Sequence, residues 1–326
     1  DPRRHSDHAA RGSAEDRLTM RSALIRCALA LVVLTSAATA EESTIRVGAL
    51  DAVLTTPAGI ERPPVALLIA GSGSTDRDGN GPQLKPATLK KLADQLAARG
   101  IASLRFDKRG ARGWTAEFGR PEDFRFKDYV GDTASLVDFL RGKFARIALV
   151  GHSEGGLVAI LTARRTPVDR LILLATSARR QGDLLKTQLE RKLPAAKMEP
   201  VAKAIDAIMA GQIVDPPPPD LPIAPQMQPG IGSAFAEDPI DPLKQITIPI
   251  LIVGGARDSQ IARLDMVALA AAAPAAKTLW LPEMNHVLVD VANEDETLAS
   301  YNDPDRPLDP DMVEAVAGFI AAAGPR

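Results

Sequence analysis

Cysteine, histidine and aromatic residues are all scarce in this chain of 326 residues. The one cysteine, Cys27, excludes a disulfide framework and a thiolate-bound zinc cluster. Aromatic residues make up 4% of the sequence, so the core has to be built mainly from Ala, Leu, Val and Ile. The four histidines leave few candidates for a reaction that needs an imidazole.

A strong excess of charge is missing as well. Charged residues make up 25% of the chain, the net charge is −2, and no basic stripe alternates with aromatic residues, which argues against nucleic-acid binding. The one basic cluster, residues 108–112, is expected to be a solvated turn. With 45% hydrophobic residues, the chain is long enough to bury a large core.

Residues 20–40 have the pattern of a secretory signal peptide. Arg21 and Arg26 precede a short apolar run at 27–34, and the small-residue site Ala38-Thr39-Ala40 follows. The apolar run is too short to span about 30 Å of hydrocarbon. We therefore expect residues 1–40 to be a cleaved leader and the protein to be exported, periplasmic or secreted, without a stable membrane anchor.

From residue 43 onward, short apolar runs alternate with segments of helical periodicity. Alternating strands and helices predict an α/β fold whose mostly parallel sheet is covered on both faces. The first two strands are expected to form an antiparallel pair. The expected strands are 45–50, 52–56, 65–70, 102–106, 147–150, 171–175, 249–253 and 278–281, and the expected helices are 86–99, 129–140, 154–164, 261–272 and 311–323.

The alternation breaks between residues 178 and 245. Two charged amphipathic helices are expected over 178–211, and six prolines follow within 215–225, which excludes a helix or central strand there. This stretch is predicted to be an insertion over the carboxyl edge of the sheet, where such folds bind ligands. Met198, Ile205 and Ile208 either line an acyl pocket or form core, and their helical spacing favours core.

The sharpest chemical signal is the segment Gly151-His152-Ser153-Glu154-Gly155, between an expected strand and an expected helix. In this G-x-S-x-G pattern, a tight turn raises the serine hydroxyl above the sheet, and its glycines are needed because a Cβ would not fit. Ser153 is therefore the candidate nucleophile, and the Glu154 N–H lies at a helix N-terminus.

Only two histidines follow the expected leader, and a serine nucleophile needs one as its base. His152 adjoins Ser153, so its side chain should not reach the same place. His286, in a loop after the 278–281 strand, is the predicted base.

A carboxylate should orient that histidine, and Asp258 is favoured because it follows the end of the 249–253 strand. Asp265 and Asp290 are its rivals. An oxyanion hole needs two N–H donors. One is expected from Glu154, and the other from the loop 71–73, where Ser72 is preferred and Gly73 stays open.

Taken together, the elbow, Asp258, His286 and their order in the chain resemble the α/β-hydrolase superfamily over about residues 43–322. Two further segments, Gly71–Asn80 and Arg105–Gly110, resemble its secreted or periplasmic serine esterase-like members. The resemblance implies an eight-stranded sheet with a helical cap, a hydrolase domain over 41–326, no cofactor, and acyl transfer to water.

The predicted function is hydrolysis of small-molecule carboxylic esters by a monomer or weak oligomer. A serine peptidase or thioesterase of the same fold is the alternative, and a non-catalytic binding protein is the rival from another class. Residues 76–81 imitate the start of a calcium loop, but Ala87 stands where the bidentate Glu is required, so no metal site is expected. A structural role is preferred for this loop, with its charged residues paired to Asp107 or Arg109.

Overall fold

The computed structural model describes residues 40–323, which form an eight-stranded sheet with helices on both faces. The leader predicted for residues 1–40 lies, except for Ala40, outside the described residues, and export stays a prediction. The strand order is β1-β2-β4-β3-β5-β6-β7-β8. The strands are β1 (Glu41–Val47), β2 (Leu50–Thr56), β3 (Val65–Ile69), β4 (Ala102–Phe106), β5 (Ile147–His152), β6 (Arg170–Leu174), β7 (Ile250–Gly255) and β8 (Lys277–Leu281).

The sheet is antiparallel at one edge and parallel elsewhere. β2 pairs antiparallel with both β1 and β4, and every pair from β4 to β8 is parallel. β3 is apolar and buried along its whole length, as are β5 up to His152 and β6 after Arg170, because helices cover both faces. The predicted fold class is confirmed by this sheet and its helical insertion.

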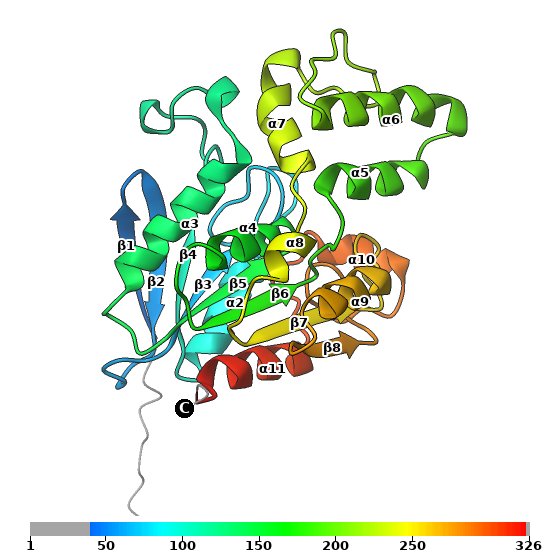
Figure 1. The fold of residues 1–326 in the computed structure, drawn as a ribbon. Coiled ribbons are helices and arrows are strands. Elements are labelled where there is room, and N and C mark those ends of the chain that lie inside the picture. Colours follow the sequence, from blue (N-terminus) through cyan, green and yellow to red (C-terminus); the bar gives the residue numbers. More distant parts are fainter. Residues whose placement is uncertain (1–39, 324–326) are drawn as a thin grey trace, which may run out of the picture. The chain divides into compact units, whose positions relative to one another are not determined.

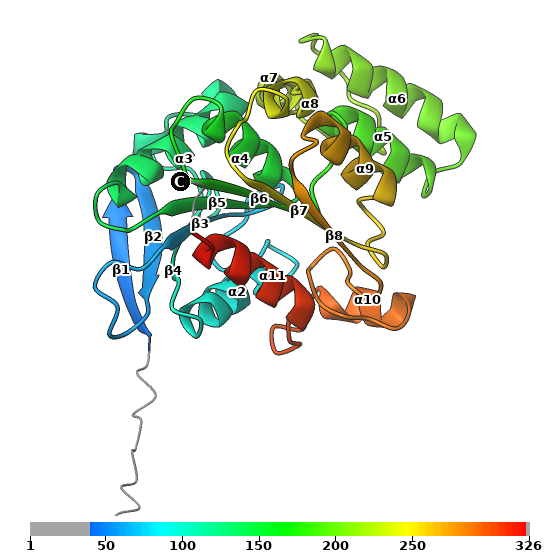
Figure 2. The same cartoon turned by 60° about the horizontal axis from the view of Figure 1, so that its bottom comes forward.

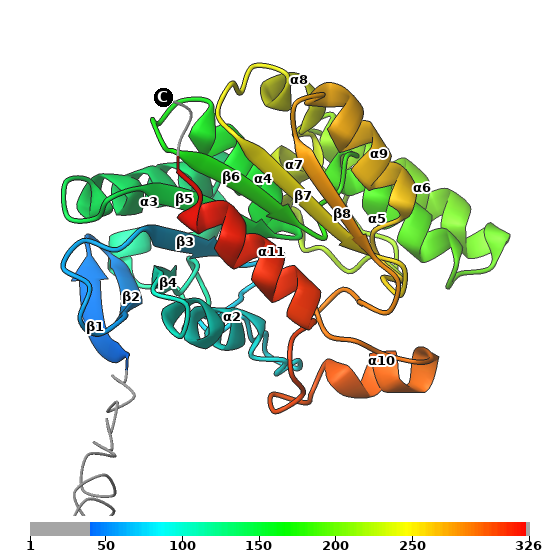
Figure 3. The same cartoon turned by 90° about the horizontal axis from the view of Figure 1, so that it is seen from below.

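Helices cover both faces of the sheet (Figures 2 and 3). On the first face lie α2 (Thr88–Ala97) and α11 (Pro310–Ala321), and on the second lie α3 (Phe126–Leu140), α4 (Glu154–Ala163) and α9 (Arg263–Ala272). Alternate residues of β3 divide between these layers: Leu68 packs towards α2 and α11, whereas Leu67 packs towards α3 and α4.

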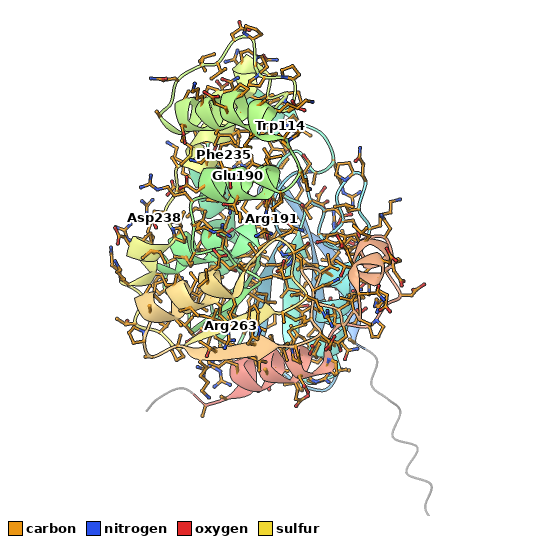
Figure 4. All side chains as sticks on the ribbon, turned by 90° about the vertical axis from the view of Figure 1, so that its right-hand side faces the viewer. Trp114, Glu190, Arg191, Phe235, Asp238 and Arg263 are labelled. Atoms are coloured by element: carbon orange, nitrogen blue, oxygen red, sulfur yellow. The ribbon has the colours of Figure 1, made fainter. Side chains whose placement is uncertain are left out.

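A helical insertion lies between β6 and β7 and rises above the carboxyl end of the sheet (Figure 1). It has its own apolar cluster, in which Val201, Ile205 and Ile208 are buried. Phe235 packs against this cluster and lies between the levels of α5 and α6 in Figure 4. The insertion contains α5 (Gln181–Glu190), α6 (Ala195–Met209), a short 3₁₀ turn η3 (Pro225–Met227) and α7 (Gln228–Phe235), and α8 (Ile240–Leu243) leads back to β7.

Three helices of the structure were not predicted: α7, α8 and α10 (Glu294–Ser300). The two glycines of α7 hide its periodicity, but both are required by close packing. A Cβ on Gly232 would clash with the Ile208 carbonyl, and one on Gly230 would lie 3.0 Å from the Phe124 ring. No helix in the described part of the chain combines the length and apolar character of a bilayer span.

Candidate active site

Ser153 stands on a tight turn between β5 and α4. Its backbone has φ 54° and ψ −121°, a conformation that non-glycine residues rarely adopt. A Cβ on Gly151 would clash with the Gly155 carbonyl, and one on Gly155 would clash with the Ile69 carbonyl. The predicted need for both glycines is confirmed, and the turn places Ser153 at the carboxyl edge of the sheet.

His286 and Asp258 come from the loops that follow β8 and β7. The His286 Nδ1–H donates to Asp258 Oδ2 at 2.8 Å, and the two side chains are 7% and 1% exposed. Asp258 Oδ1 accepts the N–H groups of Gln260 and Ile261 at 2.7 and 2.9 Å. Because the carboxylate holds the proton on Nδ1, the Nε2 of a neutral His286 is left able to accept one.

The two rival carboxylates are engaged elsewhere. Asp265 Oδ2 binds Arg179 Nη2 at 2.8 Å, and its Oδ1 accepts from the Ser177 hydroxyl at 3.0 Å. Asp290 is largely exposed, and the partial burial of its carboxyl, together with the neighbouring Asp309, raises its pKa to about 6. The structure therefore brings Asp258, the preferred candidate, onto the His286 ring.

A cavity of about 270 Å³ joins the candidate nucleophile and base. Ser153, His286 and Ser72 all line it, and Asp258 stands behind His286. Half of its lining residues belong to the loop between β3 and α2, and no residue of the 178–245 insertion lines it. The apolar wall residues are Ala70, Leu84, Pro86, Leu89 and Val287.

Met198, Ile205 and Ile208 lie in the buried cluster of the insertion, as their spacing favoured. None of the three lines the cavity beside Ser153. The interpretation of these residues as core is confirmed.

The two predicted oxyanion donors belong to two segments that meet at Ser153. Glu154 is the first residue of α4, so the helix supplies no acceptor for its N–H. Ser72 follows Gly71, which packs directly on the nucleophile: a Cβ on Gly71 would lie 3.3 Å from the Ser153 Cβ.

The solvated turn expected over residues 108–112 is wrong for Lys108. This side chain is 2% exposed, and its ammonium donates to Glu154 Oε1 at 2.7 Å and to the Gly71 carbonyl at 2.8 Å. Arg109 is also held, by two bonds to Asp132 of 2.6 and 2.7 Å. Sequence reasoning missed Lys108 because its partners lie 37 and 46 residues away.

The loop 71–80 is bound to the segment 105–112 by further ion pairs. Arg77 donates to both carboxylate oxygens of Asp107, at 3.1 and 2.6 Å, as predicted for a structural role. Arg105, 3% exposed, donates to Asp78 Oδ1 at 3.0 Å. Asp76 Oδ1 accepts the N–H groups of Asp78 and Asn80, so this carboxylate shapes the turn itself.

His152 was excluded as the base, but its contact with His286 was missed. Its Nε2–H donates to the His286 carbonyl at 2.7 Å, and the ring centroids are 5.1 Å apart. Burial, together with the nearby His286, lowers the pKa of His152 to about 4, so the ring is neutral at pH 7. His152 therefore ties the elbow to the loop of the candidate base.

Gln260 and Tyr301 form a polar corner of the cavity that the sequence did not reveal. Gln260 Nε2 donates to the Tyr301 hydroxyl at 2.7 Å. Burial raises the pKa of Tyr301 to about 12, so the phenol keeps its proton as a donor. Across residues 40–323, His, Cys, Asp and Glu side chains form no group of three that could hold a metal ion.

Comparisons with known proteins agree with this architecture. A model described as "Alpha/beta hydrolase family" matches residues 66–299. Esterase EstD of Thermotoga maritima is 26% identical over 252 residues, which cover 75% of this chain and 56% of that protein. The match thus spans about half the length of this relative.

Solved structures show the same fold. Est1E from Butyrivibrio proteoclasticus, bound to ferulic acid, is 18% identical with a TM-score of 0.52, covering 86% of this chain and 96% of its own. A thioesterase domain from the curacin biosynthetic pathway is 17% identical with a TM-score of 0.52, covering 87% and 100%. Because the family model spans more than half of the sequence, this chain belongs to the alpha/beta hydrolase family.

Proposed function

We propose that this protein is a serine hydrolase that cleaves small carboxylic esters through an acyl-enzyme on Ser153. One observation carries the proposal: Ser153 and His286 line a single cavity, and Asp258 binds the far side of the His286 ring at 2.8 Å. A nucleophile, a base and an orienting carboxylate are the groups that this reaction requires.

The reaction proceeds in two halves. Ser153 Oγ attacks the ester carbonyl carbon while His286 Nε2 takes its proton, and the N–H groups of Ser72 and Glu154 receive the oxyanion. The tetrahedral intermediate collapses, and His286 returns the proton to the leaving alkoxide. Water then attacks the acyl-enzyme with the same proton transfers, which releases the carboxylic acid and restores Ser153.

The cavity favours a short, uncharged acyl group. Its volume of about 270 Å³ lies below the range of roughly 300–1,000 Å³ that is typical of drug-sized ligands. No Asp, Glu, Lys or Arg is among its lining residues, so it offers no partner for a charged peptide terminus. This absence favours an ester substrate over a peptide.

Hydrolysis of p-nitrophenyl esters from acetate to octanoate tests the proposal, with thioesters and a peptide anilide of matched acyl groups alongside. We expect activity on short esters that Ser153→Ala and His286→Ala each lower about 10³-fold or more, while the surface variant Ser135→Ala retains it. Fluorophosphonate labelling of the wild type but not of Ser153→Ala should accompany this.

Other outcomes contradict the proposal in distinct ways. If the probe labels the protein and only the peptide anilide is cleaved, the protein is a peptidase. If thioesters are cleaved in preference to esters, it is a thioesterase. A folded protein with neither labelling nor turnover would indicate a binding protein that keeps the fold.

A further inference from the structure

Lys108 is a buried cation that does not line the cavity beside Ser153, yet it contacts Gly71, which packs on the nucleophile, and Glu154, which follows it in the chain. Its ammonium donates to the Gly71 carbonyl at 2.8 Å and to Glu154 Oε1 at 2.7 Å. Gly71 begins the loop after β3, and Glu154 begins α4. A single ammonium thus joins two segments that the chain brings together from 83 residues apart.

The Gly71 carbonyl and the Ser72 N–H belong to one peptide unit. In a planar trans peptide, the carbonyl and the N–H point in opposite directions. A donor that fixes the carbonyl therefore fixes the direction of the N–H. Lys108 holds the carbonyl end, and the other end is the donor that the proposed oxyanion hole takes from this loop.

The bond from Lys108 to Glu154 acts on the second proposed oxyanion donor. Glu154 contributes its N–H to the proposed hole, and its carboxylate is held by the same ammonium. Thr75 supports the arrangement, because its hydroxyl donates to the Ser72 carbonyl at 2.9 Å. The Lys108 side chain therefore helps to fix the distance between the two proposed donors, the N–H groups of Ser72 and Glu154.

The surroundings keep this ammonium charged. Burial alone would lower the pKa of Lys108, but Glu154 and Tyr129 together more than offset it, and the pKa lies above its ordinary value. The Tyr129 ring centroid lies 4.2 Å from the ammonium and adds a cation–π contact. With water excluded, a positive charge at the carbonyl also polarises the peptide and strengthens its N–H as a donor.

We propose that Lys108 is a positioning residue for the oxyanion hole, holding the Gly71–Ser72 peptide and the start of α4 at the spacing that the tetrahedral intermediate requires. This inference rests on the proposed esterase function. Because negative charge develops on the substrate oxygen only during the reaction, Lys108 should affect kcat rather than KM.

The test uses two variants and one control. Lys108→Met removes the ammonium but leaves the Glu154 carboxylate buried without its partner, which can destabilise the fold. The double variant Lys108→Met/Glu154→Gln removes both charges and keeps the side-chain volumes close. Arg109→Met is the control, since it breaks the neighbouring ion pair to Asp132 without touching Gly71 or Glu154.

Two measurements are made on each folded variant. The first is kcat and KM on a short p-nitrophenyl ester. The second is the inhibition constant of a trifluoromethyl ketone, whose carbonyl carbon bonds to Ser153 Oγ while the serine proton passes to His286 and the ketone oxygen becomes the oxyanion. Thermal unfolding confirms that each variant is folded at the assay temperature.

We expect the double variant to lose kcat by roughly 10- to 100-fold, because a misdirected donor loses part of the 10²–10³-fold effect of a deleted one. KM should change less than about threefold, and the ketone should bind more weakly by the factor lost in kcat/KM. Arg109→Met should keep wild-type values.

A folded double variant with wild-type kcat and ketone affinity would overturn the inference. So would a loss confined to KM, or a loss of kcat equal to that of Arg109→Met. These results are distinct from failure of the proposed function, in which the wild type itself neither hydrolyses esters nor forms the ketone adduct.

Discussion

Asp258 lies in the loop after β7, and Asp265 lies in α9, the helix that follows this loop. The hydrogen-bond partners of the two carboxylates give them different roles. Asp258 Oδ1 is filled by two backbone N–H groups, which leaves Oδ2 for His286. Asp265 is occupied by Arg179, Ser177 and the N–H of Ala262 at the start of its own helix. At the scale of residues, the hydrogen-bond partners and not the position in sequence separate an orienting carboxylate from a structural one.

Replacing Asp258 should therefore remove chemistry rather than stability. In Asp258→Asn the amide donates to Nδ1, so the proton of a neutral His286 moves to Nε2, which can then no longer accept from Ser153. We expect kcat to fall by about 10³–10⁴-fold in a folded protein. Steady-state ester hydrolysis with circular dichroism measures both properties.

Asp265→Asn is the matched control for this change. It weakens the hold on Arg179, so it should lower the melting temperature while kcat stays within about threefold of wild type. An equal loss of kcat in both variants would contradict the assignment of Asp258 as the carboxylate that orients His286.

At the scale of elements, the loop between β3 and α2 and the helical insertion have separate tasks. The loop supplies half of the residues that line the cavity, whereas the insertion packs around its own apolar cluster. One contact between the insertion and the rest of the domain is a hydrogen bond in which the Phe126 N–H donates to the Ser233 hydroxyl of α7 at 2.8 Å. The loop should then decide which acyl groups fit.

Leu84 offers a direct test, since it lines the cavity and is 44% exposed, so a larger side chain does not disturb the core. Leu84→Trp should narrow the cavity and lower kcat/KM for hexanoate relative to acetate esters by about 10-fold or more. The acyl-length profile of p-nitrophenyl esters measures this.

Ile213→Trp is the corresponding control in the insertion, where Ile213 is 53% exposed and lines no part of the cavity. Its acyl-length profile should match the wild type. If the acyl-length profile changed in Ile213→Trp but not in Leu84→Trp, the insertion and not the loop would determine which acyl groups fit.

The strands and the larger helices were predictable from sequence because each carries its own signal. Continuous apolar runs mark β3, β5, β6 and β7, whereas β4 alternates apolar and polar residues and was predicted with its observed bounds, 102–106. α7 and α10 were missed for physical reasons. α7 depends on glycines that packing requires, and α10 is a short, largely exposed helix with three acidic residues in its first turn.

The candidate site divides in the same way. Ser153, Asp258 and His286 could be named because each has a local signal: an elbow, a strand end and a scarcity of histidine. The contacts of Lys108 and His152 could not, because a charged or polar side chain in a loop or at the end of a strand is buried only by partners far along the chain. For such residues the local sequence predicts solvent exposure, because it does not show the distant partners that bury them.

At the scale of the whole molecule, two apolar layers enclose the sheet and a third cluster fills the insertion. His152 bridges distant parts of this structure, from the end of β5 to the loop after β8, through its bond to the His286 carbonyl. Its ring is held neutral, so its protonation is linked to the free energy of unfolding of the entire domain.

The sign of this linkage follows from the pKa of His152, about 4 when folded and 6.5 ordinarily. Between these values the unfolded chain binds more protons at this residue, so acidification from pH 7 to 4.5 should lower the part of the free energy of unfolding that His152 contributes. The His152 contribution is roughly 2–3 kcal/mol. Urea denaturation at both pH values measures the change.

His152→Gln keeps an amide donor but does not titrate, so it should lose less stability on acidification than the wild type by that amount. The comparison also removes the effect of Asp290, whose raised pKa of about 6 acts in the opposite direction in both proteins. Parallel losses in the two proteins would contradict the assignment.

The backbone conformation of Ser153 has an evolutionary consequence. A residue with a Cβ at φ 54° and ψ −121° costs of order 1–3 kcal/mol relative to a relaxed conformation, whereas glycine adopts it readily. Glycine at this position would stabilise the fold and abolish the proposed nucleophile. Selection for thermostability alone would thus favour loss of this serine, and only selection for turnover would oppose that loss.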